Sequence, residues 1–155
     1  MGLDQYLSAS EYISRWDYTE DFDSSENELF KQIVSQFDVA VDPVGHAGIQ
    51  IEFPMGYWRK ANQIHTWFVK NLGNGVDECQ KMFVTRQQLE ELRDLCKQVL
   101  ADISLADELL PTGAGFFFGS VEYDEWYFKD LKNTVQIIDR CLKSKFDYFE
   151  YQASW

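Results

Sequence analysis

The segment 57–72 constrains the fold most strongly, because its apolar residues recur at the spacing of one helix face. They are Tyr57, Ala61, Ile64, Phe68 and Leu72. Steps of three and four residues place these side chains on a single stripe. Gly73 follows directly, at a position where glycine commonly ends a helix. The pattern therefore predicts a helix over 57–72 whose apolar stripe packs into the core.

A neighbouring face of this expected helix carries side chains that can hold a ligand. They are Trp58, Arg59, Asn62 and His65. An arginine can grip a phosphate or carboxylate through two parallel hydrogen bonds, and an indole ring can stack on a nucleobase. Arg59 can equally pair with one of the chain's many acids, and His65 fits a half-buried, hydrogen-bonded residue better than a general base. We expect the four side chains to form one wall of a ligand pocket.

Turn residues and apolar periodicity divide the rest of the chain into short elements. The expected strands cover 3–8, 39–41, 49–53 and 79–84, with a hairpin loop over 42–48. Further helices are expected from Ser24 or Ser25 to Gln36, after the capping box of Thr85 and Gln88, and after Ser120 or Asp124 with an apolar face that runs to Phe149. These elements predict an α+β fold, in which a small, mainly antiparallel sheet of four or five strands packs against about four helices. Since no internal repeat or linker interrupts the chain, we expect a single domain over 1–155.

Three consecutive phenylalanines, Phe116 to Phe118, stand between Gly115 and Gly119. A short buried strand between two flexible backbone points is the simplest explanation. Four polar side chains lie close by in the sequence, namely Thr112, Ser120, Tyr123 and Asp124. Together with backbone N–H groups at the start of the last helix, they form a corner that suits an anion or a ribose hydroxyl. The alternative is that the acids there only stabilise the helix dipole.

The net charge of −12, from 26 acidic and 14 basic residues, restricts the partners of the chain. Such a field repels nucleic acid and anionic membranes, and it favours solubility or a basic protein partner. Six of the acids lie in the segment 17–28, and the residues at the ligand offsets of a calcium-binding loop there are Asp17, Thr19, Asp21, Asp23, Ser25 and Glu28. The sixth position of that loop requires glycine, and here it is Phe22. We therefore expect a solvated acidic loop without calcium.

Catalytic and metal-binding signatures are missing from the sequence. HExxH, GxSxG and Walker A motifs are absent, and the histidines are His46 and His65 alone. Tetrahedral metal centres need three or four nitrogen or sulfur ligands. We expect no metal, no cofactor and no catalytic residue. Three scattered cysteines indicate free thiols in a reducing cytosol, and no apolar run reaches transmembrane length, so no membrane is expected as a partner.

Several segments resemble a family of small uncharacterised proteins encoded by bacteriophages and prophages. They are 57–68, 110–112 and 115–120, together with 1–4 and 123–127. The likeness covers most of the chain except the acidic loop and the hairpin. It implies a phage gene product that acts in the cytoplasm of the bacterial host, and it implies no role for any single residue. Small phage proteins of this size are often inhibitors of bacterial defence.

These observations predict a phage anti-defence protein that binds and sequesters a nucleotide-derived signalling molecule of the bacterial host. Aromatic stacking would hold the base, and Arg59 together with N–H groups at a helix end would hold phosphate, so binding without bond cleavage suffices. Two alternatives stay open. One is an acidic, DNA-mimic-like inhibitor of a host defence protein, and the other is a hydrolase of the nucleotide signal that uses His65 or Asp124 as its base. The aromatic-rich composition is compatible with a homo-oligomer.

Overall fold

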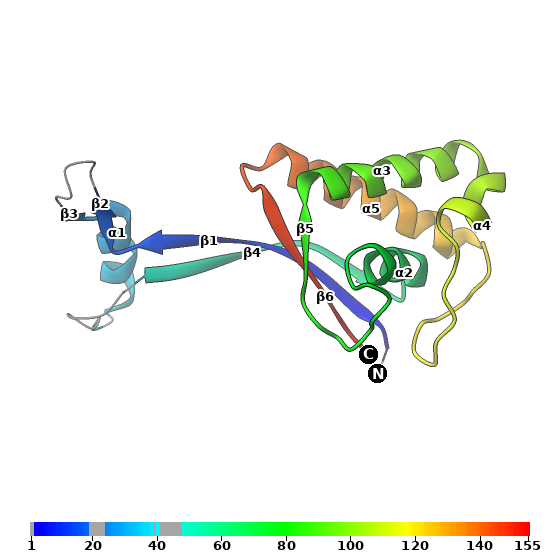
Figure 1. Ribbon diagram of the computed structural model, residues 1–155, viewed down its shortest axis with the longest axis horizontal. Coiled ribbons are helices and arrows are strands. Elements are labelled where there is room, and N and C mark those ends of the chain that lie inside the picture. Colours follow the sequence, from blue (N-terminus) through cyan, green and yellow to red (C-terminus); the bar gives the residue numbers. More distant parts are fainter. Residues whose placement is uncertain (1, 19–23, 39, 41–47) are drawn as a thin grey trace. The chain divides into compact units, whose positions relative to one another are not determined.

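The structure is a computed structural model that describes residues 2–18, 24–38, 40 and 48–155. Its contacts divide the chain into two compact units. The larger unit comprises Met1–Ala9 and Pro54–Trp155, and the smaller unit comprises Ser10–Phe53. Strands β1 and β4 contribute residues to both units (Figure 1). The two units are described separately below.

The larger unit is built on a four-stranded sheet with the strand order β4-β1-β6-β5. Its strands are β1 (Asp4–Ser14), β4 (Gly48–Arg59), β5 (Met82–Thr85) and β6 (Tyr148–Ser154). Strand β6 pairs antiparallel with both β1 and β5. Side chains alternate between the two faces of the sheet. The inward face is apolar, with Leu3, Leu7, Phe149, Tyr151 and Val84 fully buried.

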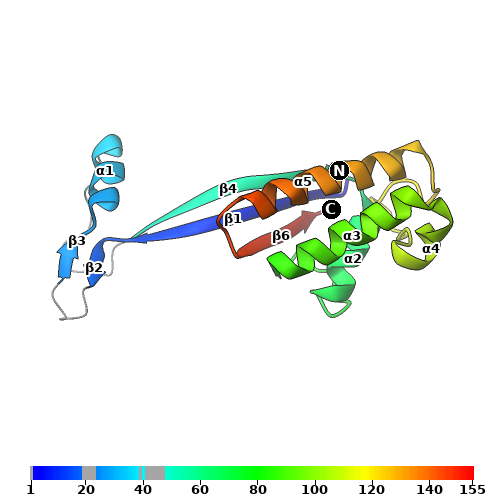
Figure 2. The same ribbon diagram turned by 90° about the horizontal axis from the view of Figure 1, so that it is seen from above.

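Four α-helices complete the larger unit. They are α2 (Asn62–Asn71), α3 (Arg86–Ala101), the short α4 (Ala106–Leu109), which follows a 3-10 turn at Ile103–Leu105, and α5 (Glu125–Lys143). Helices α3 and α5 lie side by side (Figures 1 and 2). Their apolar faces join α2 and the inward face of the sheet in one core, where the ring of Tyr151 on β6 stacks on Phe68 of α2 with 3.8 Å between ring centroids.

Local sequence signals explain where the long helices begin. Helix α3 starts with the expected capping box, since the Thr85 hydroxyl accepts from the Gln88 N–H, and the Gln88 side chain accepts from the Thr85 N–H. Helix α5 starts at Asp124, whose carboxylate accepts from the N–H groups of Trp126 and Tyr127. Both helix starts are therefore encoded by residues within one turn of the cap.

The smaller unit contains the outer parts of β1 and β4, a two-stranded sheet of β2 (Trp16–Tyr18) and β3 (Ser24–Glu26), and helix α1 (Glu28–Phe37). The helix cap is Asn27, because Ser24 and Ser25, the expected caps, pair with β2 as strand β3. An ion pair of 2.9 Å joins Arg15 to Glu26 beside this sheet. Much of the acidic loop and of the expected strand 39–41 and hairpin loop 42–48 lies outside the described residues.

The expected helix over 57–72 begins five residues later, at Asn62, and the prediction for 57–59 is wrong. Strand β4 continues through Arg59, with Trp58 buried and Tyr57 exposed, so the aromatic pair follows the period of two of a strand. The break comes at Lys60, which adopts a left-handed backbone with φ 61°. The apolar stripe of Ile64 and Phe68 is buried as expected.

Three further expectations are corrected by the structure. The segment Gly115–Gly119 is a turn and not a strand, closed by the Phe118 N–H on the Gly115 carbonyl, and Phe116 is 95% exposed instead of buried. Strand β5 begins at Met82, because Cys79 holds a left-handed backbone that interrupts an extended segment. Helix α5 ends at Lys143, and Phe149 belongs to strand β6, which the helical spacing had concealed.

The α+β class, with a small antiparallel sheet and several helices, is confirmed. The single domain over 1–155 stays a prediction. Cys79, Cys96 and Cys141 are free thiols. Among the described residues, no helix combines the length and the apolar character needed to cross a membrane.

One buried hydrogen bond ties the sheet to α5, and its removal tests the core. The Trp58 indole N–H donates to the Thr134 hydroxyl at 2.8 Å, with both side chains buried. Thr134→Val keeps the shape and leaves the indole N–H without a partner. We expect the free energy of unfolding, measured by urea denaturation, to fall by about 1–3 kcal/mol.

The control is the double variant Trp58→Phe with Thr134→Val, which removes donor and acceptor together. Its loss should be clearly smaller than the sum of the two single losses. Strict additivity would show that the bond does not contribute.

Candidate functional site

The turn between β4 and α2 presents two cations, Arg59 and Lys60, and buried groups fix it in place. The Lys60 N–H donates to the Leu3 carbonyl at 2.7 Å. The fully buried amide of Gln5 satisfies both backbone groups of Ala61, accepting from its N–H and donating to its carbonyl, each at 3.1 Å. The backbone of this turn is therefore held by β1, which leaves the two cationic side chains exposed.

The loop after Pro111 folds back onto the same turn through Asn62. The Asn62 amide donates to the carbonyls of Phe118 and Ser120 at 3.1 and 2.8 Å, and its oxygen accepts from the Gly113 N–H at 3.0 Å. Gly119 adopts φ 88°, and a Cβ there would lie 3.2 Å from the Cβ of Lys60. A glycine is therefore needed for this close approach.

A cleft of about 430 Å³ lies between this turn, the loop and the start of α5. Its lining residues are Arg59, Lys60, Gly119, Ser120, Glu122, Asp124, Trp126, Tyr127 and Asp130. The volume falls in the range of about 300–1,000 Å³ that is typical of small-molecule sites. We call this the Arg59–Trp126 cleft.

The cations of the cleft have no local counter-charge that engages them. Neither Arg59 nor Lys60 forms an ion pair with any residue in the described part of the chain, although carboxylates line the same cleft. The indole of Trp126 is 66% exposed, and the Lys129 ammonium lies 4.6 Å from its ring centroid. An exposed cationic pair beside an exposed indole can hold an anion that is joined to an aromatic ring.

Two carboxylates of the cleft have different surroundings. Asp124 is committed to capping α5, as described above. Burial raises the pKa of Asp130 to about 6, the nearby Asp124 charge adds to the rise, and a hydrogen bond from the Gln63 amide opposes it. The amide of Gln63 is itself buried and donates to the Tyr127 carbonyl at 3.4 Å, so it lies against the same part of α5.

Of the eight residues that the sequence singled out, the cleft brings together Arg59, Ser120 and Asp124. Asn62 does not line it but holds its loop. Trp58 is only 2% exposed in the core, where it cannot stack on a ligand. The Thr112 hydroxyl donates to the Val121 carbonyl within the loop, and the Tyr123 hydroxyl donates to Asp107 on α4, so neither side chain lines the cleft.

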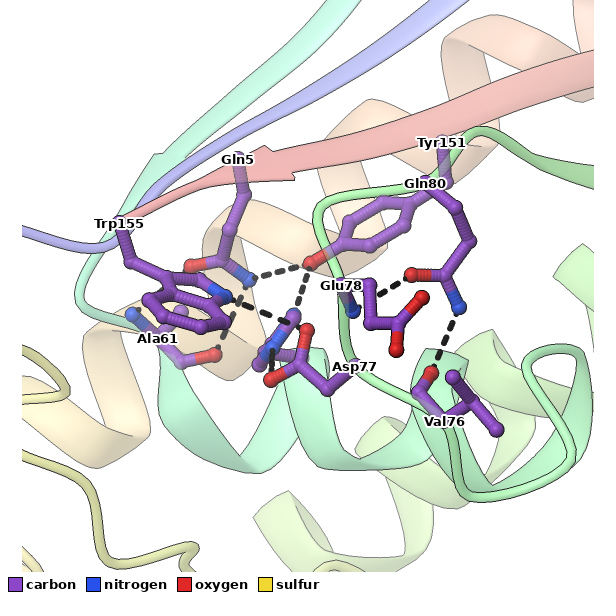
Figure 3. A network of polar contacts seen from close by, with 9 residues as sticks. Gln5, Ala61, Val76, Asp77, Glu78, Gln80, Tyr151 and Trp155 are labelled. Carbon is purple, nitrogen blue, oxygen red and sulfur yellow. Dashed lines mark hydrogen bonds and ion pairs between the residues drawn. The ribbon is translucent and has the colours of Figure 1, made fainter.

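Gln5, Tyr151, Asp77 and Trp155 take part in a polar network (Figure 3), and the buried His65 belongs to it. One ring nitrogen lies 2.8 Å from the Tyr151 hydroxyl, and the other lies 2.9 Å from Asp77, which also accepts from the Trp155 indole. Gln5 donates to the same hydroxyl at 3.2 Å. Burial raises the pKa of Tyr151 far above its usual value. Since His65 is 1% exposed and both its nitrogens are engaged, its role is structural.

The sequence reasoning missed Lys60, Trp126 and Asp130 as lining residues. The last two are four residues apart on α5, a spacing that places them on one helix face. That spacing was visible in the sequence. The placement of Lys60 in the cleft was not visible in the sequence, because it depends on the left-handed backbone at this residue.

Two other cavities lie in the larger unit. One of about 160 Å³, lined partly by Thr66, Trp67 and Lys70, is smaller than the usual small-molecule site. One of about 440 Å³ is lined by Leu100, Ile103, Phe128 and three charged residues of α5. Within the described ranges, no group of three or more histidine, cysteine, aspartate or glutamate side chains is placed to hold a metal ion.

Comparison of the chain with protein families, curated proteins and solved structures found no match.

The Asn62 amide predicts a specific effect on the loop. Asn62→Ala leaves three backbone groups without partners, so we expect faster amide hydrogen exchange over 113–120 and a loss of about 2 kcal/mol in unfolding free energy. Mass spectrometry of deuterium uptake gives the first quantity. Asn133→Ala, which removes a single bond to the Tyr57 carbonyl, is the matched control. Unchanged hydrogen exchange over 113–120 in Asn62→Ala would show that contacts other than those of Asn62 stabilise the loop.

The raised pKa of Asp130 predicts a pH-dependent stability. Between the ordinary value of 3.8 and about 6, the folded chain binds more protons than the unfolded chain, so this carboxyl group destabilises the fold as pH rises. Asp130→Asn should be more stable than the parent at pH 7.5, and the difference should shrink as pH falls from 6 to 4. The control is Asp147→Asn, which removes an exposed carboxylate outside the cleft. A constant difference across this pH range would contradict the assignment.

Proposed function

We propose that this chain binds a nucleotide-class ligand in the Arg59–Trp126 cleft and holds it without breaking a bond. One observation carries the proposal: two cations without ion-pair partners in the described chain lie beside an exposed indole in a cleft of about 430 Å³. A phosphate is an anion that a guanidinium grips well, and a nucleobase is a flat ring that stacks on tryptophan.

The phosphate belongs at the β4–α2 turn and not at the start of α5. The Asp124 carboxylate already accepts from the first free N–H groups of that helix, so the helix N-terminus offers less to a second anion. Arg59 and Lys60 face no such competition. The base then lies toward Trp126, on the other side of the cleft.

The biological setting of the proposal rests on the resemblance to phage proteins. A phage product that binds a nucleotide-derived signal of the bacterial host tightly would withdraw it from a defence system. Free thiols agree with a reducing compartment such as the host cytoplasm. Sequestration requires affinity and no catalytic base. His65 and Asp124, the two bases expected for a hydrolase, are both engaged in hydrogen bonds within the protein.

Hydrolysis remains the alternative, since Asp130 is a carboxyl group of raised pKa in the same cleft. Incubation of the protein with a bound nucleotide, followed by chromatography of the released small molecule, separates the two functions. Recovery of the intact nucleotide supports sequestration, and accumulation of a product supports hydrolysis.

Binding is tested by titration calorimetry with the monophosphates GMP, AMP, CMP and UMP. We expect at least one to bind, and Arg59→Gln to weaken it about ten-fold or more, because a charge-assisted hydrogen bond contributes about 1.5–3 kcal/mol. Lys97→Gln is the matched control, since it removes one exposed positive charge from α3 outside the cleft. Equal loss in both variants, or no binding by the parent protein, would contradict the proposal.

A further inference from the structure

The lining of the cleft also carries acids, which disfavour an entirely anionic ligand. Glu122, Asp124 and Asp130 line it together with Arg59 and Lys60. Asp124 caps α5, and the half-buried Asp130 forms no ion pair with any of the described residues. A ligand that fills this cleft must therefore present hydrogen-bond donors to Asp130 and an anion to the cations.

Asp130 and Trp126 are placed to act on the same base. They lie four residues apart on α5, and side chains at this spacing are neighbours on one helix face. A base stacked on the Trp126 ring would turn an edge toward the Asp130 carboxylate. A hydrogen bond from the buried Gln63 amide favours the ionised form of that carboxyl group, and each oxygen keeps lone pairs for further donors.

We propose that the ligand of this cleft carries a guanine base, whose N1–H and 2-amino group donate to the two oxygens of Asp130. The inference rests on the proposed function. Two parallel donors match a carboxylate in the way that a guanidinium does. Adenine and cytosine present one donor beside an acceptor on the same edge, and uracil presents one donor between two acceptors. Each of them would set an acceptor against a carboxylate oxygen.

The protonation of Asp130 agrees with this assignment. Hydrogen-bond donors of a ligand favour the ionised form of the Asp130 carboxyl group. Guanine binding should therefore strengthen as pH rises through about 6. Asp124 and Lys129 on α5 and Gln63 on α2 act on the Asp130 carboxyl group, and Arg59, Lys60 and Glu122 line the same cleft. A phosphate monoester also titrates near about pH 6, so the change assigned to Asp130 is the part that GMP shows in excess of AMP.

The test is titration calorimetry at pH 7.5 with GMP, IMP and AMP. IMP lacks only the 2-amino group of GMP, so it isolates one of the two donors. We expect GMP to bind about ten-fold or more tightly than IMP or AMP. Binding of all three with equal affinity, or tighter binding of AMP, would overturn the guanine assignment while leaving the nucleotide site intact. Absence of binding by all three would also overturn the proposed function.

The matched variant is Asp130→Asn, which replaces one acceptor oxygen with a donor. The asparagine side chain complements a base edge that presents one hydrogen-bond donor beside one acceptor. We expect GMP and IMP to bind it with affinities within about two-fold of each other, and AMP to gain relative to the parent protein. Retention of the full preference for GMP over IMP would show that another group reads the base. Circular dichroism of the variant verifies its folding, and the comparison in the parent protein does not depend on it.

Discussion

The three hydrogen bonds of the buried Asn62 amide hold the cleft together. They join the start of α2 to a loop more than fifty residues later, and without them the loop carrying Gly119 and Ser120 has few other ties to the turn. An amide can do this because it offers donors and an acceptor in one plane. The close passage of Gly119 past Lys60 then sets the width of the cleft beside the cations. The candidate site therefore depends on a residue that does not line it.

A second buried network anchors α2 from the opposite side. Gln5 on β1 bonds both to Ala61 and to the Tyr151 hydroxyl, and His65 links that hydroxyl to Asp77. Among the described residues, no buried side-chain nitrogen or oxygen lacks a hydrogen-bond partner. A fully satisfied network of this kind favours a single arrangement of its elements, because a shifted helix would leave buried polar groups unpaired. Such rigidity suits a site that works by binding alone.

The charge distribution disfavours binding of a polyanion and still allows binding of a small anionic ligand. A chain of net charge −12 repels an extended polyanion, whereas Arg59 and Lys60 act on a single phosphate at short range. At physiological ionic strength, exposed charges are screened beyond about 8 Å, so the local pair can dominate at the cleft. The acids that line the cleft add selectivity, since they disfavour a ligand that lacks donors.

Much of the fold was readable from the sequence, and much of the site was not. The capping box at Thr85 and the cap at Asp124 are local signals and were found directly. The start of α2 was misplaced because Tyr57 and Ala61 happen to fit a helical spacing, while pairing of β4 with β1 holds the backbone extended through Arg59. Arg59, Ser120 and Asp124, three of the residues chosen from the sequence, line the same cleft. Trp58 and Trp126 could not be told apart, because burial of one and exposure of the other depend on tertiary packing.

The central claim, that the Arg59–Trp126 cleft is the binding site, is tested most directly by nuclear magnetic resonance titration of the ¹⁵N-labelled protein with GMP. The five tryptophan indole N–H groups are natural reporters spread over the chain. We expect the N–H signals of the Trp126 indole and of the Lys60 and Gly119 backbone to change their chemical shifts with one common dissociation constant. The indole N–H signals of the buried Trp58 and Trp67 should keep their chemical shifts. Shifts confined to residues away from the cleft, or none at millimolar GMP, would contradict the central claim.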